Sequence, residues 1–297
     1  AGASSGPPAK LPEARLVRDL LYALQGVSST CFKLSASERK FEVDPSVVLS
    51  RPTWFLSQRI LELANLHLCL CEATGVGASS SPAGTVSGPS GSLLHQSLCE
   101  ALRVQLHDYY RVLALLMAKS EGKSALAVAP STGGGLQLSL RRLWAWLQVP
   151  LGRMQLLASL AEACAPLRGG ALASAVHGYA RVGDTLAQEA CAQILRSVVA
   201  PLLAMIRAWM TEGELQDPFG EFFVCADASV ALGELWTRMY SLDIEMVPSF
   251  LTLDLARKIL LTGKSVNFIR LCCPGQNWCP TDSKRPGVAG DNGRSLL

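Results

Sequence analysis

The chain has 297 residues, of which 49% are hydrophobic and only 17% are charged, and its formal net charge at pH 7 is +3. This net charge is too small to imply, by itself, a surface that binds nucleic acid or acidic lipid. Leu and Ala dominate over β-branched and aromatic residues, which favours helix over sheet.

The chain is expected to open with a linker and a short helix. Residues 1–11 are rich in Gly, Ser and Pro, which is typical of a linker remnant. Pro12 suits the first turn of a helix, and an apolar stripe follows it as far as Gly26, where the helix is expected to end. Ala1 stands where a start Met would be, so we expect the chain to be a fragment.

A small β-hairpin and a second helix are expected next. Two short arms of alternating apolar residues, between Phe32 and Val43, predict the hairpin, with residues 35–40 at its tip. Ser50 or Thr53 is expected to cap the helix, which runs to about residue 72.

Two flexible insertions are expected in the first half of the chain. Residues 73–92 are nearly all Gly, Ser, Pro, Ala and Thr, and residues 119–135 end in three glycines. Between the insertions, Leu94 to Leu116 keeps an unbroken helical period.

Three shorter helices are expected after the second insertion. Leu136–Leu147 and Leu151–Cys164 are predicted as two helices hinged at Pro150, because proline removes a helical hydrogen bond. The pair Gly169-Gly170 is expected to precede a short helix that ends near Arg181.

The stretch from Ile194 to Met210 is expected to form a central helix. Its large apolar side chains lie on one half of the helix at i, i+3, i+4 and i+7 spacing. A second stripe consists of small side chains: Ser197, Ala200, Ala204 and Ala208. Only Arg196 and Arg207 interrupt the surface between the stripes, so most of the circumference is expected to be covered, and Pro201 is expected to kink or restart the helix.

A turn and a last helical region are expected to follow. Gly213 suits a left-handed C-cap. Asp217-Pro218 predicts a turn, and Glu221 to Val224 is a short apolar run that is expected to re-enter the core. The remaining predicted elements are a helix around 232–240, an extended piece to 247, a helix from about 252 to 271, and a tail, 273–297, with no apolar period.

These elements predict an all-α fold: an elongated stack of antiparallel helical bundles, with at most a small β-hairpin near the N-terminus. The expected domain is one unit over residues 12–272 that carries the two insertions.

The segment from Trp209 to Val224 resembles the signature of the gamma-tubulin complex components, the Spc97/Spc98 family, in the first of their two grip domains. Its signature residues are Trp209, Gly213, Glu214, Leu215, Asp217, Pro218, Glu221, Phe222 and Phe223. Three further segments match in the family's order: Leu16–Tyr22, Gly169–Asp184 and Val247–Phe268. Within the last one, Pro248-Ser249-Phe250 and Gly263-Lys264-Ser265 are most similar to the component 3 branch.

The resemblance implies a structural scaffold. It implies side-by-side association with sibling components, a component 2-like one above all, in complexes that nucleate microtubules at a centrosome or spindle pole. Contact with gamma-tubulin is implied for the family through its second grip domain and is not expected of this chain, in which residues 273–297 depart from the family pattern. No cofactor, nucleic acid or membrane is expected as a partner.

Two motifs suggest a bound ligand, and each lacks part of its pattern. Gly263-Lys264-Ser265 matches the end of a phosphate-binding loop, but Lys258 stands where that loop needs a glycine. In His67-x-Cys69-x-Cys71, the middle residue points away from the other two on a helix, and no further ligands complete a metal site. Packing is the favoured interpretation of both.

No enzyme is expected. The sequence has no Gly-x-Ser-x-Gly elbow, and neighbouring side chains such as His107 and Asp108 diverge by about 100° on a helix. The carboxylates of the segment from Glu212 to Glu221 look like a capped helix end and a turn. Three cysteines near the C-terminus lack Cys-x-x-Cys spacing: Cys272, Cys273 and Cys279.

Arg141 and Arg142 stand next to Trp144 and Trp146 in the only basic-aromatic cluster. A nucleic-acid stacking site would need several more basic residues. The first interpretation is a helix with two exposed arginines and with its tryptophans in the core. A partner contact through Arg141, Arg142 and Trp144 is the second.

A cytoplasmic, cytoskeletal location is expected. The ten cysteines are scattered, and the chain has no Asn-x-Ser/Thr sequon, which favours a reducing compartment. The most apolar run, Ile194 to Met210, carries two arginines and a proline and is shorter than the roughly 20 residues of a membrane span. The alternative function is a general helical adaptor or tether unrelated to microtubules, against which the ordered family motifs argue.

Overall fold

The computed structural model describes residues 11–35, 39–76, 92–121, 138–181, 183–227, 229–230 and 235–272. The chain forms two compact units. The first comprises Ala1–Arg168 and Leu172–Val198, and the second comprises Gly169–Ala171 and Val199–Leu297. The predicted single domain over 12–272 stays a prediction, as do the linker, the tail and most of both insertions, which lie outside the described residues.

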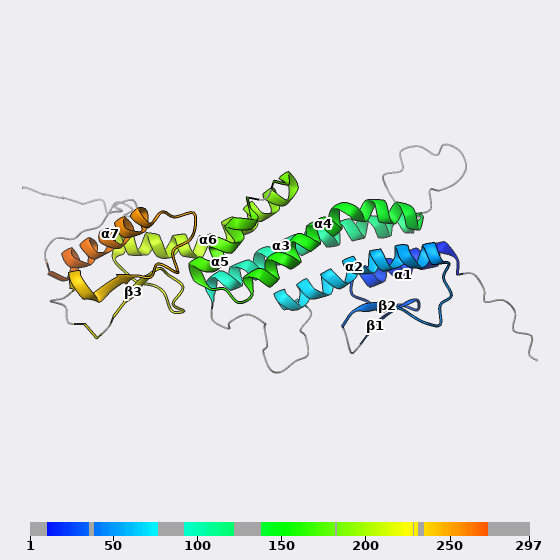
Figure 1. Ribbon diagram of the computed structural model, residues 1–297, viewed down its shortest axis with the longest axis horizontal. Helices are drawn as coiled ribbons and strands as arrows, with labels where there is room; N and C mark the ends of the chain where they lie inside the picture. Colours follow the sequence, from blue (N-terminus) through cyan, green and yellow to red (C-terminus); the bar gives the residue numbers. More distant parts are fainter. Residues whose placement is uncertain are drawn as a thin grey trace, which may run out of the picture. The chain divides into compact units, whose positions relative to one another are not determined.

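The first unit is built on four helices that lie side by side (Figure 1). They are α1 (Glu13–Leu24), α2 (Arg51–Thr74), α3 (Leu93–Ser120) and α4 (Leu140–Cys164). Helix α2 packs against both α1 and α4. Each helix turns an apolar stripe inward, and buried leucines come from all four: Leu20, Leu63, Leu113 and Leu147. Burying one such side chain contributes about 1.5–3 kcal/mol, so these stripes are the main source of the unit's stability.

The predicted N-terminal hairpin is confirmed. Strands β1 (Phe32–Leu34) and β2 (Phe41–Val43) pair antiparallel, with Leu34 opposite Phe41. Phe32 and Phe41 are fully buried, and the Asn65 side chain of α2 accepts a hydrogen bond from the backbone N–H of Phe41 at 2.7 Å. The hairpin is therefore held against α2 by both apolar packing and a hydrogen bond.

The predicted helix starts are close to the observed ones, with two differences in capping. Pro12 is the N-cap of α1 rather than a first-turn residue. Ser50 precedes α2, but its hydroxyl hydrogen-bonds the hydroxyl of Thr53 at 2.7 Å and makes no cap to a backbone N–H. Helices α2 and α3 extend to Thr74 and Ser120, slightly into the predicted insertions.

The predicted hinge at Pro150 is wrong, because α4 is one continuous helix with that proline inside it. The reason lies in the phase of its buried stripe. Leu143, Leu147, Leu151, Met154 and Leu157 are all buried and keep helical spacing through the proline. A break would have turned one half of this stripe out of the core, so packing overrides the local cost of proline.

Helix α5 spans Gly169–Tyr179 and includes the two glycines that were predicted to precede it. Helix α6 spans Thr185–Glu212 and continues through Pro201, so it does not restart there. On length and composition alone, α6 could cross a membrane, and 39% of its most apolar window is buried. Core helices of soluble proteins meet the same criterion, so the absence of a membrane partner stays a prediction.

The prediction that α6 is covered on most of its circumference is wrong for the described residues. One half of the helix is buried, including Ile194, Val198 and Leu202. On the other half, Ser197, Ala200 and Ala204 are exposed and Ala208 is half-buried. Small side chains permit a close helix contact but do not supply one, and no described element covers this stripe.

The second unit contains a short strand pair that the sequence did not predict. Strand β3 (Val224–Ala226) pairs antiparallel with β4 (Tyr240–Leu242), and α7 (Leu253–Cys272) follows. The helix predicted around 232–240 is only a π-helical turn, η2 (Leu235–Met239), in the part that the structure describes. Each strand of the two pairs has three residues. The predicted all-α class is therefore confirmed, with the β3–β4 pair as the one unexpected element of the described residues.

Candidate functional site: the signature turn

The signature turn, residues 209–224, begins with a buried tryptophan at the end of α6. Trp209 is fully buried, and its Nε1 donates a hydrogen bond to the backbone oxygen of Ile259 in α7 at 3.1 Å. Its ring meets that of Tyr240 edge-on, with the centroids 4.8 Å apart. The indole therefore joins α6, β4 and α7 through one side chain.

Gly263 is the residue that lets α7 approach this indole. A Cβ atom at position 263 would overlap Cε2 and Nε1 of Trp209. The Gly263-Lys264-Ser265 motif is thus a helix packing feature within α7, as the sequence favoured. Lys264 is buried, its ammonium donates to the backbone oxygen of Trp236 at 3.0 Å, and burial lowers its pKa.

Gly213 ends α6 in the left-handed conformation that the sequence predicted. Its φ is 67°, and its N–H donates to the Trp209 carbonyl at 3.2 Å. The Asn267 amide of α7 donates to the Gly213 carbonyl at 2.6 Å. A Cβ atom here would lie 3.0 Å from the Asn267 side chain, so both the backbone angle and the space require glycine.

Asp217 organises the turn that follows. Its carboxylate accepts backbone N–H bonds from Phe219 at 3.3 Å, Glu221 at 3.0 Å and Phe222 at 2.8 Å. Charge-assisted bonds of this kind are stronger than neutral ones. The carboxylate therefore closes the turn, which agrees with the predicted structural role.

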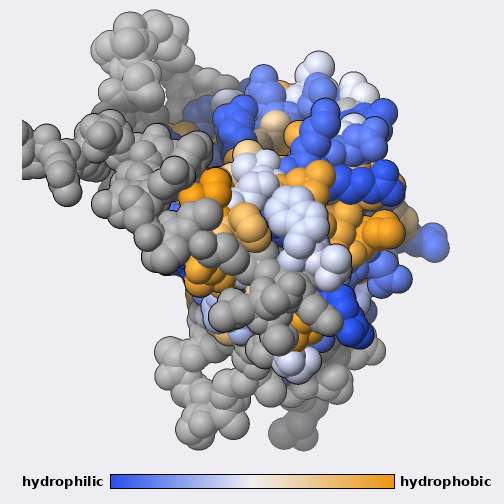
Figure 2. Space-filling view, turned by 90° about the vertical axis from the view of Figure 1, so that its left-hand side faces the viewer, coloured by the Kyte–Doolittle hydropathy of each residue, from blue (hydrophilic) through white to orange (hydrophobic). Residues whose placement is uncertain are grey.

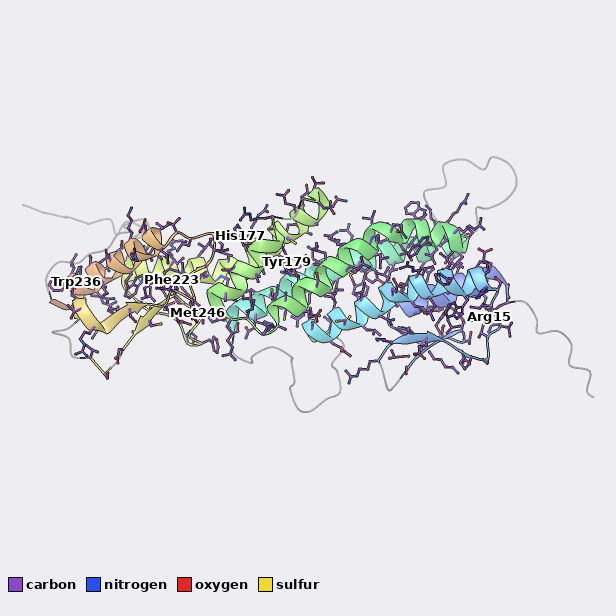
Figure 3. The ribbon with its side chains drawn as sticks, in the orientation of Figure 1. Arg15, His177, Tyr179, Phe223, Trp236 and Met246 are labelled. Atoms are coloured by element: carbon purple, nitrogen blue, oxygen red, sulfur yellow. The ribbon has the colours of Figure 1, made fainter. Side chains whose placement is uncertain are left out.

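The end of the turn enters the core beside the start of α5. Phe222 and Phe223 are buried with ring centroids 4.5 Å apart, and the Phe223 carbonyl accepts the N–H of Asp243 at 2.8 Å (Figure 3). A Cβ atom at Gly169 would lie 2.5 Å from the Glu221 carbonyl oxygen, and one at Gly170 would overlap the Met246 carbonyl. The sequence offered no sign of this use of the two glycines beyond their adjacency.

Other signature residues face solvent. Pro218 is exposed, Leu215 is half-buried, and the exposed Glu214 pairs with Arg270 of α7 at 3.4 Å. Trp236 and Phe268 are also exposed and meet edge-on, with ring centroids 6.4 Å apart. Figure 2 shows apolar side chains interspersed with hydrophilic ones on the side where Figure 3 labels Trp236.

The basic-aromatic cluster of α4 differs from its first interpretation. Arg141 and Arg142 are exposed, as predicted, but Trp144 is only half-buried and Trp146 is 54% exposed. Helix α4 buries the stripe through Leu143 and Leu147, which leaves Trp146 on the outer face. A partner contact through Arg141, Arg142 and Trp144 stays a prediction.

His67 lies in the core of the first unit, as the sequence favoured. Its Nε2 is 2.7 Å from the hydroxyl of Tyr110 and 3.3 Å from Sγ of Cys71, while Cys69 is exposed on another face. Burial lowers the pKa of His67 to about 4. No group of three or more His, Cys, Asp or Glu side chains within the described ranges could hold a metal ion.

His107 and Asp108 do not form a pair. His107 is exposed, while the Asp108 carboxylate is 3.4 Å from the Arg153 guanidinium and 3.8 Å from that of Arg111. In the signature turn, the Asp217 carboxylate likewise accepts hydrogen bonds from backbone N–H groups and that of Glu214 pairs with Arg270. Asp108, Glu214 and Asp217 are thus each held by ion pairs or hydrogen bonds.

The described residues thus define a helical-bundle protein whose most specific feature is a packed turn between α6 and β3. The chain belongs to the gamma-tubulin complex component family, because the family's N-terminal model matches residues 17–294. That match runs beyond residue 272, after which the chain was predicted to depart from the family pattern.

Similar proteins agree with this assignment. The chain is 38% identical to gamma-tubulin complex component 3 of Arabidopsis thaliana over 285 residues, covering 96% of this chain and 33% of the relative. It is 36% identical to component 3 of Homo sapiens, over 92% of this chain and 29% of the relative. It is 28% identical to component 2 of Mus musculus, over 88% of this chain and 28% of the relative. The chain is most like component 3, and it spans about a third of the length of these relatives.

Proposed function

We propose that this chain is a structural part of a gamma-tubulin complex that associates side by side with sibling components, in particular a component 2-like one. The observation that carries the proposal is the match to component 3 at 36–38% identity over more than nine-tenths of the chain. The complex would support microtubule nucleation, because laterally packed bundles set the spacing at which gamma-tubulins are presented.

The packing of the signature turn supports a mechanical role. Trp209, Gly213 and Asp217 hold the end of α6 against α7 and close the following turn through hydrogen bonds to backbone groups. Their polar groups are engaged in the fold. We therefore infer that the domain is not an enzyme and acts by holding a shape.

The location that we propose is the cytoplasm, at a centrosome, spindle pole or equivalent microtubule-organising centre. Among the described residues, seven cysteines are free thiols, which suits a reducing compartment. We assign gamma-tubulin contact to regions of the family other than these residues, following the resemblance to the first grip domain.

Co-purification with a component 2-like sibling tests the proposal. We expect the chain and the sibling to elute together from a sizing column, in the absence of gamma-tubulin. Full-length component 3 serves as the positive control. If component 3 forms the pair and this chain does not under the same conditions, the general adaptor becomes the better explanation.

A direct binding measurement tests the assignment of gamma-tubulin contact. We expect purified gamma-tubulin to bind full-length component 3 and not to bind this chain alone. Comparable binding to both would place part of that contact within these residues.

A further inference from the structure

Helices α3 and α4 of the first unit leave an apolar groove of about 900 Å³ between them. Three of the large apolar side chains that line it are well exposed: Leu115 at 65%, Trp146 at 54% and Val149 at 66%. Contiguous exposed apolar surface of this kind marks a place where another surface packs. Figure 1 shows the two helices running alongside each other.

The walls of the groove are two matching helical stripes. Asp108, Val112, Leu115 and Lys119 follow i, i+4, i+7, i+11 spacing on α3, and Trp146, Val149 and Arg153 follow i, i+3, i+7 spacing on α4. The stripes run antiparallel, because the Lys119 ammonium lies 4.1 Å from the Trp146 ring centroid and Arg153 meets Asp108 at the other end. From Asp108 to Lys119 the wall is about 16 Å long, or three helical turns.

The two ends of the groove differ in charge. At one end, the Asp108 carboxylate pairs with Arg153 at 3.4 Å, so the charges that line this end cancel, and Arg153 Nε also donates to Gln105 at 3.0 Å. Arg111, 3.8 Å from the same carboxylate, does not line the groove. At the other end, Lys119 has no carboxylate partner among the described residues and stacks on Trp146. A partner with carboxylates beside Lys119 would complement this charge, whereas a basic one would be repelled.

The polar groups of the groove also indicate the class of occupant. A small-molecule site usually has several polar groups that converge on the ligand. Here Asp108, Arg153 and Gln105 bind one another and leave the apolar walls as the main binding surface. An apolar groove between two helices is the form that receives the apolar face of another helix.

We propose that the α3–α4 groove binds an amphipathic helix of a partner protein. Its apolar side chains, at i, i+3, i+4 and i+7 spacing, pack on Leu115, Trp146 and Val149, and its acidic end lies beside Lys119. This site is additional to the side-by-side association with sibling components and does not depend on it.

Binding of designed peptides to the full chain tests the proposal by fluorescence anisotropy. The probe is a labelled amphipathic helix of about 16 residues, with leucines at the stated spacing and glutamates at one end. We expect it to bind at least tenfold more tightly than the same helix with lysines at that end. Val149→Glu should weaken binding at least tenfold, while Val27→Glu, at a position 53% exposed outside the groove, should leave it unchanged.

Lys119→Glu should reverse the preference between the acidic-ended and basic-ended peptides. Thermal melts should show that Val149→Glu, Val27→Glu and Lys119→Glu all remain folded. Equal affinity for the two peptides, no effect of Val149→Glu, or no binding to the wild-type chain would overturn the proposal. A photo-crosslinker at Leu115 in cells should label an acidic helical segment of another protein. Labelling of a sibling's bundle, a second copy or a small molecule would instead assign the groove to that occupant and overturn the proposal.

Discussion

At the scale of single residues, the contact between Gly263 and Trp209 shows how one missing methyl group determines a helix contact. The indole is buried and bonded to Ile259, so it cannot move aside for a Cβ atom at position 263. Gly263→Ala should therefore destabilise the protein by about 1–3 kcal/mol through overpacking, although alanine is the better helix former. Urea unfolding measures this loss.

Gly152 provides the matched control for that substitution. It lies inside α4 with nothing within 4 Å of a Cβ atom built on it. Gly152→Ala should stabilise by about 0.5–1 kcal/mol, the usual gain in a helix interior. Equal effects of the two substitutions would show that the Trp209–Gly263 contact is looser than described.

His67 makes stability depend on pH in a defined direction. Burial lowers its pKa from 6.5 to about 4, so the folded state favours the neutral ring. As pH falls below about 6.5 the unfolded chain gains a proton that the folded chain does not. Stability is therefore full above pH 6.5 and falls by about 3 kcal/mol on approaching pH 4.

Urea midpoints between pH 7 and pH 4.5, for the wild type and for His67→Gln, measure this effect. The variant keeps a polar side chain but cannot titrate, so its stability should fall less over the same range. Parallel curves for the two proteins would mean that His67 does not carry the dependence.

At the scale of elements, α4 shows a proline retained inside a helix by packing on both sides of it. Pro150 lacks the N–H that would complete the helical ladder, while the flanking Leu147 and Leu151 are buried. Pro150→Ala should therefore stabilise the protein by about 1–3 kcal/mol, since it restores a hydrogen bond and leaves the buried leucines in place. A thermal melt measures the gain, and a lower melting temperature would indicate that the proline ring makes a stabilising contact.

The elements that sequence could predict are those specified by local periodicity. The stripes of α1, α3 and α7 and the alternation around Phe32 are readable within one window of sequence. The β3–β4 pair was missed because it depends on Val224 meeting Leu242, which lies outside a local window of sequence. In the described part of the region where a helix was expected, from residue 235 on, the chain forms a π-helical turn and then β4.

The candidate site was predictable in its residues but not in its contacts. The resemblance singled out the signature residues, and helix-end rules gave Gly213 its role. The three N–H bonds to Asp217 and the close approaches at Gly169 and Gly263 are properties of the folded chain. Likewise, the α3 wall of the α3–α4 groove is predictable as a stripe, whereas the continuity of the α4 wall through Pro150 and the adjacency of the two walls require the packed bundle.

At the scale of the whole molecule, a scaffold should lose its assembly only when it loses its fold. A substitution of Asp217 distinguishes a scaffold role from a direct role in partner binding. The reason is that its carboxylate accepts hydrogen bonds from backbone N–H groups of the turn and so supports the fold. Asp217→Ala should destabilise by about 2–4 kcal/mol through the loss of charge-assisted bonds. Glu214→Ala, at an exposed position where the carboxylate meets Arg270 and Gln216, should change stability by less than about 1 kcal/mol.

Co-elution of each variant with a component 2-like sibling, measured at two temperatures, then tests the proposed scaffold role. Below its melting transition, Asp217→Ala should assemble as the wild type does. Above that transition, where the wild type is still folded, it should not assemble. Loss of assembly at both temperatures would place Asp217 in the partner contact itself, and the turn would then be an interface rather than a support for one.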